Sequence, residues 1–423
     1  MNGGVTQALA SRLRGKAAQP LRYAGANHRI RLLQGAQELF AVLIAEVDAA
    51  QSDVQMETYI FDCNGVGADV AEALARAARR GVQVQLVVDG VGTGSLPAPV
   101  QALLQQAGVQ LQVYSPLGPL GLLLPRRWRR LHRKLCAVDG RVLFCGGINV
   151  LDDYYDPNHG RLDAPRLDFA VRVEGALVPY ASDVMEQLWW RMRAVSDVQR
   201  RRLAQALADW RAARANRLQV RRAEERGTGV RAALVLRDNL RHRGRIERAY
   251  RRAIGRARHE IVIANAYFVP GAKLRRALVL AAGRGVRVRL LLQGRYEYFM
   301  QYHAARPVYG ALLAAGVEIH EYAPSFLHAK VAVIDAQGVR PWATVGSSNL
   351  DPLSLLLARE ANVMVRDSAF AQDLHARLEQ AMADGCGPIN ARDYANRPWR
   401  QRVLDRIAFA IMRAALWVTG NNY

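Results

Sequence analysis

The feature that most constrains this sequence is that its second half repeats the order of segments found in its first half. Residues 77–90 (AARRGVQVQLVVDG) and 281–294 (AAGRGVRVRLLLQG) each read as the end of a helix, a glycine turn and an apolar strand. In both halves a strand-like segment comes before this unit, and a helix, a small Ala-Gly turn and further strands come after it. The same order at similar spacing indicates an internal duplication.

Each half is predicted to be an α/β unit, because its segments follow the order strand, helix, strand, helix, strand, strand. We expect two duplicated α/β/α halves with mixed β-sheets flanked by helices, packed about a pseudo-two-fold axis. The predicted boundaries are a loose N-terminal leader at 1–27, the first half at 28–194, a basic connector at 195–228, the second half at 229–385 and a C-terminal amphipathic segment at 386–423.

A short motif, His-x-Lys-x4-Asp, occurs once in each half, inside an apolar run. The residues of the two copies are His132, Lys134 and Asp139, and His328, Lys330 and Asp335. Alternation along a strand places the histidine and the lysine of one copy on the same face. If the halves pack about a pseudo-two-fold axis, the two faces meet in one cleft that holds two imidazoles and two ammonium groups.

Such a cleft suits a phosphate group. The lysines, together with the amides of Asn149 and Asn349, supply donors to non-bridging oxygens. One histidine can attack phosphorus while the other protonates the leaving oxygen. The second copy has Ser347 where the first has Gly147, so we expect Ser347, with its neighbour Ser348 as the alternative, to add a phosphate-binding hydroxyl and make the site asymmetric. No cage of carboxylates accompanies the set, so neither a metal nor a cofactor is expected.

The acidic residues divide into two groups. Asp139 and Asp335 complete the candidate catalytic motif, but they lie on the opposite parity from the lysines and at the strand end, which favours a structural role such as capping a turn. Asp168 and Glu360 open later strands at similar distances beyond the two histidines. They are the candidates for orienting each imidazole through its Nδ1–H, with the alternative that they are edge-strand acids.

With the Gly-x-x-Asn turns that follow them, the two motif copies resemble the paired HKD motifs of the phospholipase D superfamily. The resemblance covers about residues 28–385. Within the superfamily the chain is most similar to the bacterial cardiolipin synthases of the shorter B type. The stretches that carry this likeness are ETYIF at 57–61, IANAYFVPG at 263–271 and ATVGSSNLDPLSL at 343–355.

The resemblance implies phosphatidyl transfer through a phosphatidyl-histidine, with His132 as nucleophile and His328 as general acid and base. The donor and acceptor would be phosphatidylglycerol, and the products cardiolipin and glycerol. A hydrolytic phospholipase D or a nuclease of the same superfamily is the alternative enzyme. A scaffold protein with a decayed site is disfavoured because both motif copies are intact.

The formal charge of +22 favours a polyanionic partner, namely nucleic acid, a phosphorylated substrate or an anionic membrane face. Since apolar leucines stand beside the basic run before the first motif, we expect anionic phospholipids and not nucleic acid. The residues predicted to contact the membrane are Leu122, Leu123, Leu124, Trp128, Trp399 and Trp417.

No run of about 18 uncharged apolar residues occurs in the sequence. We therefore expect peripheral association with the bacterial inner membrane at its cytoplasmic face. The tryptophans at 399 and 417 flank a predicted amphipathic helix whose apolar face carries Leu404, Ile407 and Ile411. Packing of this helix on the core of the protein is the alternative, and the sequence leaves the oligomeric state open.

Overall fold

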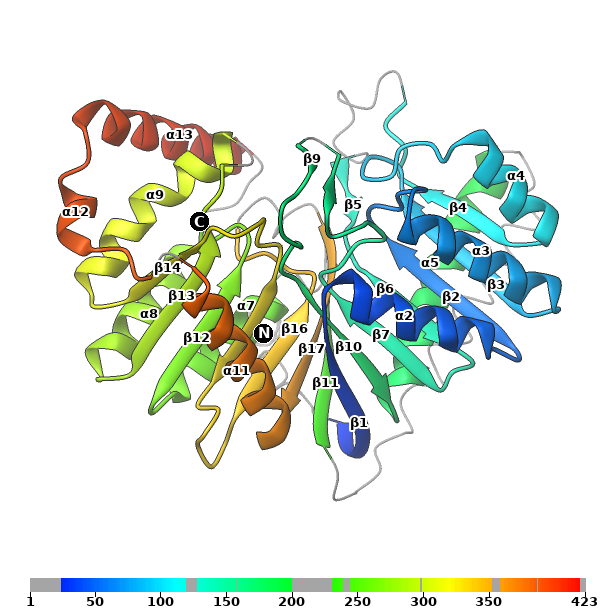
Figure 1. The fold of residues 1–423 in the computed structure, drawn as a ribbon, viewed down its shortest axis with the longest axis horizontal. Helices are drawn as coiled ribbons and strands as arrows, with labels where there is room; N and C mark the ends of the chain where they lie inside the picture. The colour runs from blue at the N-terminus through cyan, green and yellow to red at the C-terminus, as the bar shows by residue number, and fades with distance from the viewer. Residues whose placement is uncertain are drawn as a thin grey trace, which may run out of the picture.

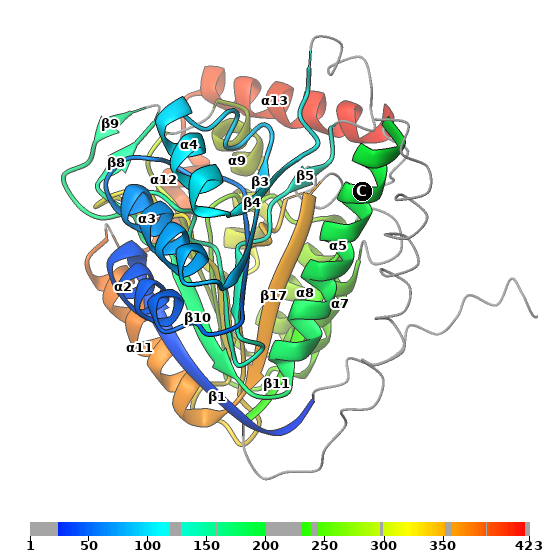
Figure 2. The same ribbon diagram turned by 90° about the vertical axis from the view of Figure 1, so that its right-hand side faces the viewer.

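A computed structural model describes residues 24–118, 128–157, 159–199, 230–238, 244–296, 299–351, 358–385 and 387–418. Figure 1 shows two α/β halves side by side, with strands at the centre of the molecule and helices around them, and in Figure 2 the first half faces the viewer. The predicted fold class is confirmed.

A single 15-stranded sheet runs through both halves, in the order β14-β13-β12-β15-β16-β17-β11-β1-β10-β7-β6-β2-β3-β4, with β5 paired to β17 off this path. The strands of the first half are β1 (Ala24–Gln34), β2 (Asp53–Thr58), β3 (Gln83–Asp89), β4 (Gln110–Tyr114), β5 (Arg130–Leu131), β6 (Leu135–Val138), β7 (Val142–Gly146) and β10 (Phe169–Glu174). The strands of the second half are β11 (Val230–Arg237), β12 (Glu260–Asn265), β13 (Arg287–Gln293), β14 (Glu318–Tyr322), β15 (Lys330–Ile334), β16 (Trp342–Gly346) and β17 (Ala358–Arg366).

The strand order is the same when read outward from the β1–β11 pair in either direction. These two antiparallel strands join the halves, with Ala24 opposite Ala232 and His28 opposite Val230. In each half the outer three strands are parallel, and an antiparallel pairing connects them to the motif strand. The duplication read in the sequence is therefore repeated in the topology. A short hairpin of β8 (Tyr155–Asp156) and β9 (Gly160–Arg161) lies outside this sheet.

Helices cover the outer faces of the sheet, and the inner faces pack on each other. The helices of the first half are α2 (Gly35–Asp48), α3 (Val66–Arg79), α4 (Ala98–Ala107) and α5 (Leu177–Gln199). Those that follow are α7 (Arg245–Arg256), α8 (Ala272–Gly283), α9 (Phe299–Ala314), α11 (Ser368–Ala383), α12 (Ala391–Ala395) and α13 (Trp399–Val418).

The inner core contains side chains from strands of both halves, including Val171, Val331 and Val363, together with residues of α5 and α11. Burial of strands on both faces explains why the motif strands consist of near-continuous apolar runs. The two separate outer cores lie under α2 and α3 in one half and under α7, α8 and α9 in the other.

Two element bounds differ from the sequence expectation. Strand β1 begins at Ala24, inside the segment predicted as a loose leader, because its backbone pairs with β11. Helix α5 continues to Gln199, past the predicted end of the first half at residue 194. Most of the predicted leader and most of the predicted connector lie outside the described residues.

The motif aspartates lie at the ends of β6 and β15, where each strand turns back. Asp139 accepts hydrogen bonds from the backbone N–H groups of Gln51, Ser52 and Asp53. Asp335 accepts them from the three backbone N–H groups of residues 258–260, in the second half. Both aspartates have a positive φ, which aspartate tolerates better than most residues. Their carboxylates hold turns at the opposite end of the strands from the histidines, which supports the structural role that their parity favours. A part of Asp139 and Asp335 in catalysis stays a prediction.

Candidate active site

The two motif histidines enter one site from opposite halves, at the beginnings of β6 and β15. His132 follows β5, and β5 pairs in parallel with the beginning of β17 in the second half. The N–H of His132 donates to the carbonyl of Arg359 at 3.0 Å. In the other direction, the N–H of His328 donates to the carbonyl of Leu167 at 2.9 Å. Each histidine is therefore fixed by backbone hydrogen bonds to the half that does not contain it.

This exchange places each histidine beside a carboxylate of the other half. Nδ1 of His132 lies 3.1 Å from the Glu360 carboxylate, and Nδ1 of His328 lies 2.7 Å from Oδ2 of Asp168. Both carboxylates are almost fully buried, whereas the imidazoles keep 16% and 18% of their surface exposed. The spacing of the two acids predicted contacts of this kind but not that they would cross between the halves. The orienting roles of Asp168 and Glu360 stay predictions.

The two lysines bring buried positive charge to the same site. Lys134 donates to the carbonyl of His132 at 3.1 Å, and Lys330 contacts both the carbonyl and the ring of His328. Burial, together with the charge of Lys330, lowers the pKa of Lys134 to about 7. The pKa of His328 is lowered well below its ordinary value by burial and then by Lys330 and Lys134. Two ammonium groups that destabilise each other in this way favour an anion between them.

The carboxylates differ in their protonation. Burial alone would raise the pKa of Glu360, but the charges and hydrogen bond of His132 and the charges of Arg237 and Lys134 lower it below the ordinary value. Burial raises the pKa of Asp168 to about 7, even though Lys330 acts in the opposite direction. Near neutral pH, Glu360 is therefore ionised, whereas the His328–Asp168 pair holds a proton below about pH 7 and gives it up above that value.

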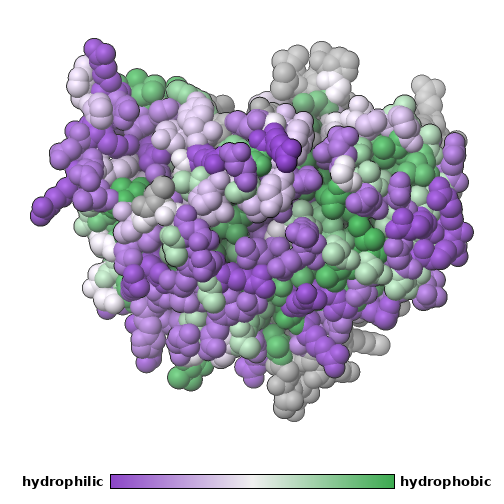
Figure 3. Space-filling model, in the orientation of Figure 1, coloured by the Kyte–Doolittle hydropathy of each residue, from purple (hydrophilic) through white to green (hydrophobic). Residues whose placement is uncertain are grey.

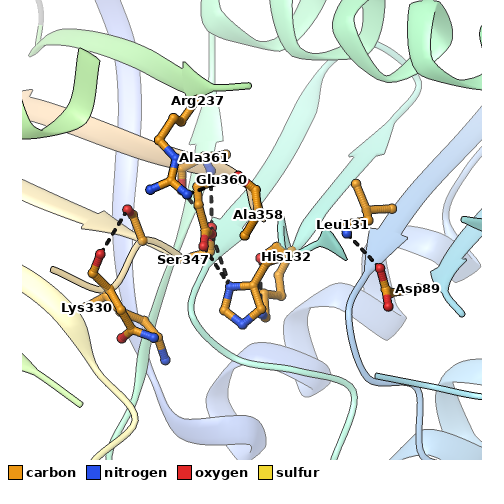
Figure 4. Close-up of polar contacts among 12 residues, drawn as sticks. Asp89, Leu131, His132, Arg237, Lys330, Ser347, Ala358, Glu360 and Ala361 are labelled. Atoms are coloured by element: carbon orange, nitrogen blue, oxygen red, sulfur yellow. Dashed lines mark hydrogen bonds and ion pairs between the residues drawn. The ribbon is translucent and has the colours of Figure 1, made fainter. Parts of the chain in front are cut away.

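The residues that follow β7 and β16 also differ beside the two carboxylates. Ser347 is fully buried, and its Oγ donates to Glu360 at 2.5 Å and accepts from the N–H of Ala361 at 3.1 Å. In the structure this hydroxyl is engaged with the carboxylate and with β17 (Figure 4), and phosphate binding by Ser347 stays a prediction. At Gly147 a Cβ atom would lie 2.4 Å from Oδ1 of Asp168, so this position has no room for a side chain.

The two asparagines lie in the turns that follow β7 and β16. Asn149 is 8% exposed, and its Oδ1 accepts from the N–H of Ile60 at 3.2 Å, which fixes the orientation of the amide. Asn349 is 3% exposed, and within the described part of the chain its Oδ1 has no hydrogen-bond partner. Phosphate binding by the two amides stays a prediction.

Sequence reasoning missed two positions that hold the histidines in place. The Oδ2 of Asp89 accepts from the N–H of Leu131 at 2.7 Å (Figure 4), and its Oδ1 lies 3.0 Å from Nη1 of Arg130. In the other half, Oε1 of Gln293 accepts from the N–H of Leu327 at 3.1 Å. The signal was available, because these residues occupy the same place in the repeated segments, just before the closing glycine.

An aromatic ring also borders the site. The Tyr59 ring centroid lies 4.8 Å from that of His132 and 5.3 Å from Nζ of Lys134. Tyrosine at this distance from an ammonium group stabilises the positive charge. Tyr59 lies within the ETYIF stretch that carries the family likeness, but its position beside the motif could not be read from the sequence.

The only group of side chains with metal-ligand spacing among the described residues lies away from the histidines. Its three members are Glu260, His375 and Glu379. The guanidinium of Arg289 lies 2.8 Å from Glu260 and also contacts Glu379, so the carboxylates already have a cation. These contacts describe an ion-pair network on the face of the second half.

The predicted membrane-contacting residues are only partly described. Leu122, Leu123, Leu124 lie outside the described residues, as does the side chain of Trp417. Trp128 is 36% exposed and Trp399 is 69% exposed. In the described parts of the chain, no helix is long and apolar enough to cross a bilayer.

The fold and the site together define a class of protein: a duplicated α/β enzyme in which a histidine and a lysine from each half meet in one site. Residues 43–160 and 250–382 match the family model described as "Cardiolipin synthase, PLD-like domain". The chain is 35% identical over 401 residues to cardiolipin synthase B of Escherichia coli, covering 91% of this chain and 88% of the relative. The chain therefore belongs to the cardiolipin synthase family with phospholipase D-like domains.

More distant comparisons agree with this assignment. Cardiolipin synthase A of Erwinia tasmaniensis is 28% identical over 384 residues, covering 90% of this chain and 74% of the relative. Among solved structures, a phosphatidylserine synthase of Haemophilus influenzae superposes with a TM-score of 0.63 at 14% identity, covering 94% of this chain and 97% of the other. At that identity the structural match supports the fold alone.

Proposed function

We propose that this enzyme is a phosphatidyltransferase that transfers a phosphatidyl group from one phosphatidylglycerol to a hydroxyl of a second, forming cardiolipin and glycerol. The observation that carries the proposal is the crossed arrangement of the site. Two partly exposed histidines, each backed by a buried carboxylate, stand beside two buried lysines. This set fits an in-line displacement at phosphorus with one nucleophile and one acid.

The protonation of the two pairs supports His132 as the nucleophile. The ionised Glu360 accepts the Nδ1–H of His132, so that Nε2 presents its lone pair to the cleft. Nε2 attacks phosphorus while the bond between phosphorus and the head-group oxygen breaks. The His328–Asp168 pair, which holds a proton below about pH 7, gives that proton to the departing oxygen, and glycerol leaves.

The second step reverses these roles. His328 accepts the proton of an acceptor hydroxyl, the acceptor oxygen attacks phosphorus, and the bond between phosphorus and Nε2 of His132 breaks. Lys134 and Lys330 stay next to the phosphate in both steps and stabilise the charge on its non-bridging oxygens. Water in place of the lipid hydroxyl would give phosphatidic acid, which is the hydrolytic outcome.

A lipid substrate requires the enzyme to work at a membrane surface. We propose peripheral association with the inner membrane of a bacterium, at the cytoplasmic face. The support is the net charge of +22 and the exposure of Trp128 and Trp399.

The direct test is to incubate the purified enzyme with phosphatidylglycerol vesicles and follow the lipids by mass spectrometry. We expect cardiolipin and free glycerol in equal amounts. We expect His132→Ala and His328→Ala each to abolish turnover, because each group has a separate part in the displacement. His259→Ala, an exposed histidine at the other end of the sheet, is the matched control and keeps wild-type activity.

Three results would contradict the proposal. Phosphatidic acid as the sole product would indicate hydrolysis. Cleavage of DNA without lipid turnover would indicate a nuclease. After an alkaline quench during turnover, we expect the phosphatidyl adduct on the peptide that contains His132, and an adduct on His328 would reverse the assignment of nucleophile and acid.

A further inference from the structure

Away from the histidines, α9, α12 and α13 enclose a surface cavity of about 390 Å³ in the second half. Four arginines line it, and we call it the arginine pocket: Arg306, Arg397, Arg402 and Arg406. Asp405 is the one carboxylate in the lining. Figure 1 shows α9, α12 and α13, which form the pocket, grouped at the upper left edge of the second half.

The inner side of the pocket is fixed by packing. Arg306 is 8% exposed, forms an ion pair with Glu321 at 2.7 Å, and stacks 4.3 Å from the ring centroid of Tyr302. Arg397 lies 3.6 Å from the ring centroid of Tyr394. The aromatic rings thus hold two guanidinium groups in place. Their side chains therefore lose less conformational entropy when an anion binds.

The lone carboxylate of the lining is already neutralised. Asp405 is 3% exposed and lies 2.7 Å from Nδ1 of His303 and 3.0 Å from Nη1 of Arg397. These contacts anchor α13 to α9 and leave little negative charge for the other arginines. The pocket therefore keeps a surplus of positive charge.

The outer side of the pocket is formed by Arg402 and Arg406, one turn apart on α13. Both are exposed, and no ion pair to either is found within the described residues. Like charges four residues apart on a helix repel each other. An anion that enters the pocket relieves this repulsion and can reach the fixed arginines behind it.

Next to these arginines α13 presents an apolar stripe to solvent, defined by Val403, Leu404, Ile407 and Ile411, which are 38–55% exposed. The helix packs on the protein through a different face, on which Ala408 and Met412 are buried. Figure 3 shows hydrophobic surface at the upper edge of the molecule over α13, next to hydrophilic surface. A basic face beside an exposed apolar face is typical of helices that lie in a lipid–water interface.

The position of α13 relates this surface to the catalytic site. In Figure 2 the helix runs along the edge of the molecule at which β5 and the beginning of β17 lie, and these two strands position His132. A bilayer that contacts the stripe would therefore face the end of the molecule that holds the histidines.

We infer that the arginine pocket binds the phosphate of an anionic phospholipid while the apolar stripe enters the acyl boundary of the same leaflet. This is a second lipid site, separate from the one where the chemistry takes place. The inference rests on the proposed function only in that both require a lipid surface. The occupant is a membrane lipid, because the stripe adjoining the pocket requires an apolar neighbour that neither a free phosphate nor a nucleic acid supplies.

The test is co-sedimentation of the full chain with vesicles of phosphatidylcholine, with and without phosphatidylglycerol. We expect Arg402→Gln/Arg406→Gln to weaken binding to the anionic vesicles about thirtyfold and to change binding to the neutral ones little. The matched control is Arg258→Gln/Arg340→Gln, which removes the same charge from exposed arginines in turns at the other end of the sheet and keeps wild-type binding. Ile407→Ser/Ile411→Ser should weaken binding to both kinds of vesicle.

Turnover in detergent micelles separates this inference from the proposed function. We expect the two pocket substitutions to leave micellar turnover unchanged and to reduce turnover on vesicles.

Equal loss of vesicle binding in the pocket and control variants would overturn the inference, since the effect would then be that of net charge. Loss of DNA binding with intact vesicle binding would also overturn it, as would a concentration-dependent dimer that the stripe variant abolishes. Vesicle binding that follows these expectations without turnover of any lipid would contradict the proposed function alone.

Discussion

At the scale of single residues, two identical motifs are placed in unequal surroundings. Behind His132 lie a serine hydroxyl and an ionised glutamate. Behind His328 lie a glycine and an aspartate whose raised pKa keeps it protonated to a higher pH. The first arrangement suits a group that must present a lone pair, and the second suits a group that must hold a proton until the leaving oxygen needs it. The surroundings of the two imidazoles, and not the motifs themselves, thus distinguish the roles proposed for them.

The protonation of Asp168 leads to a prediction on pH. Because the pKa of Asp168 is about 7, the His328–Asp168 pair loses its proton as the pH rises through about 7, and kcat/KM falls over that range. In Asp168→Asn the proton must reside on His328 alone, whose pKa is well below its ordinary value. We expect the alkaline limb of kcat/KM to move to lower pH and its maximum to fall about a hundredfold to ten-thousandfold.

The pH profile of the variant is the deciding measurement, because a merely structural loss would lower the curve without moving it. Ser182→Ala, in the same half but within α5, serves as the control and should leave the limb in place. An Asp168→Asn profile that keeps the wild-type limb would show that the carboxylate does not share the proton.

The histidines, the lysines and the two acids behind them could be selected from the sequence because residue type and spacing repeat in both halves. The crossing of the carboxylates could not, because spacing within one copy carries no information about the partner half. The contact between Ser347 and Glu360 was missed for a related reason. A hydroxyl placed next to a phosphate-binding turn suggests a phosphate ligand, and only the three-dimensional path of β17 shows that a carboxylate lies closer.

At the scale of elements, the motif aspartates secure turns. Burial alone would raise the pKa of Asp139, but hydrogen bonds from the backbone of residues 51–53 hold it well below its usual range. The stability that this carboxylate contributes is therefore fully present above its unfolded pKa and is lost as the pH falls from that value through its lower folded pKa. Asp139→Ala should lower the free energy of unfolding by about 1–3 kcal/mol, since it leaves three backbone donors without their acceptor.

Chemical denaturation at neutral and acidic pH measures this loss, and turnover per folded molecule should change less than about tenfold, well below the loss expected for an acid or base. Asp139→Asn is the matched variant, because asparagine tolerates the positive φ and keeps one acceptor oxygen. A full loss of turnover in a folded Asp139→Ala protein would place this residue in the catalytic set.

The C-terminal helix shows how far the spacing of apolar residues can predict the surroundings of a helix. The spacing of Leu404, Ile407 and Ile411 identified an apolar face, but periodicity alone cannot say whether such a face meets a core or a membrane. The structure packs α13 through Ala408 and Met412 and leaves the predicted face outside. Small and unbranched side chains such as these give a weak signal in the sequence, although they determine how the helix docks.

At the scale of the whole molecule, the site belongs to both halves of one chain. We therefore predict that mixing the His132→Ala and His328→Ala proteins restores no activity, because each chain carries one defect in its single site. The measurement is cardiolipin formation by the mixture after joint refolding. Recovery of about a quarter or more of wild-type turnover would indicate halves exchanged between two chains, as in domain swapping.

The doubled fold was predictable, but the continuity of its sheet was not. Segment order and strand composition determine which elements form, whereas the joining of β1 to β11 depends on backbone hydrogen bonds between two edges. Backbone pairing of this kind leaves no characteristic side chains, so two separate sheets and one continuous sheet give the same pattern of residues. For the same reason the sequence did not predict that β1 begins at Ala24, because this segment has no strong periodicity.

The crossed contacts at the histidines also bear on the history of the chain. After most duplications one copy is free to accumulate changes while the other keeps the original task. Here each copy supplies a histidine to one pair and a carboxylate to the other, so each pair depends on both copies. Neither copy is redundant, and selection must act on the two as a single unit for as long as the activity is kept.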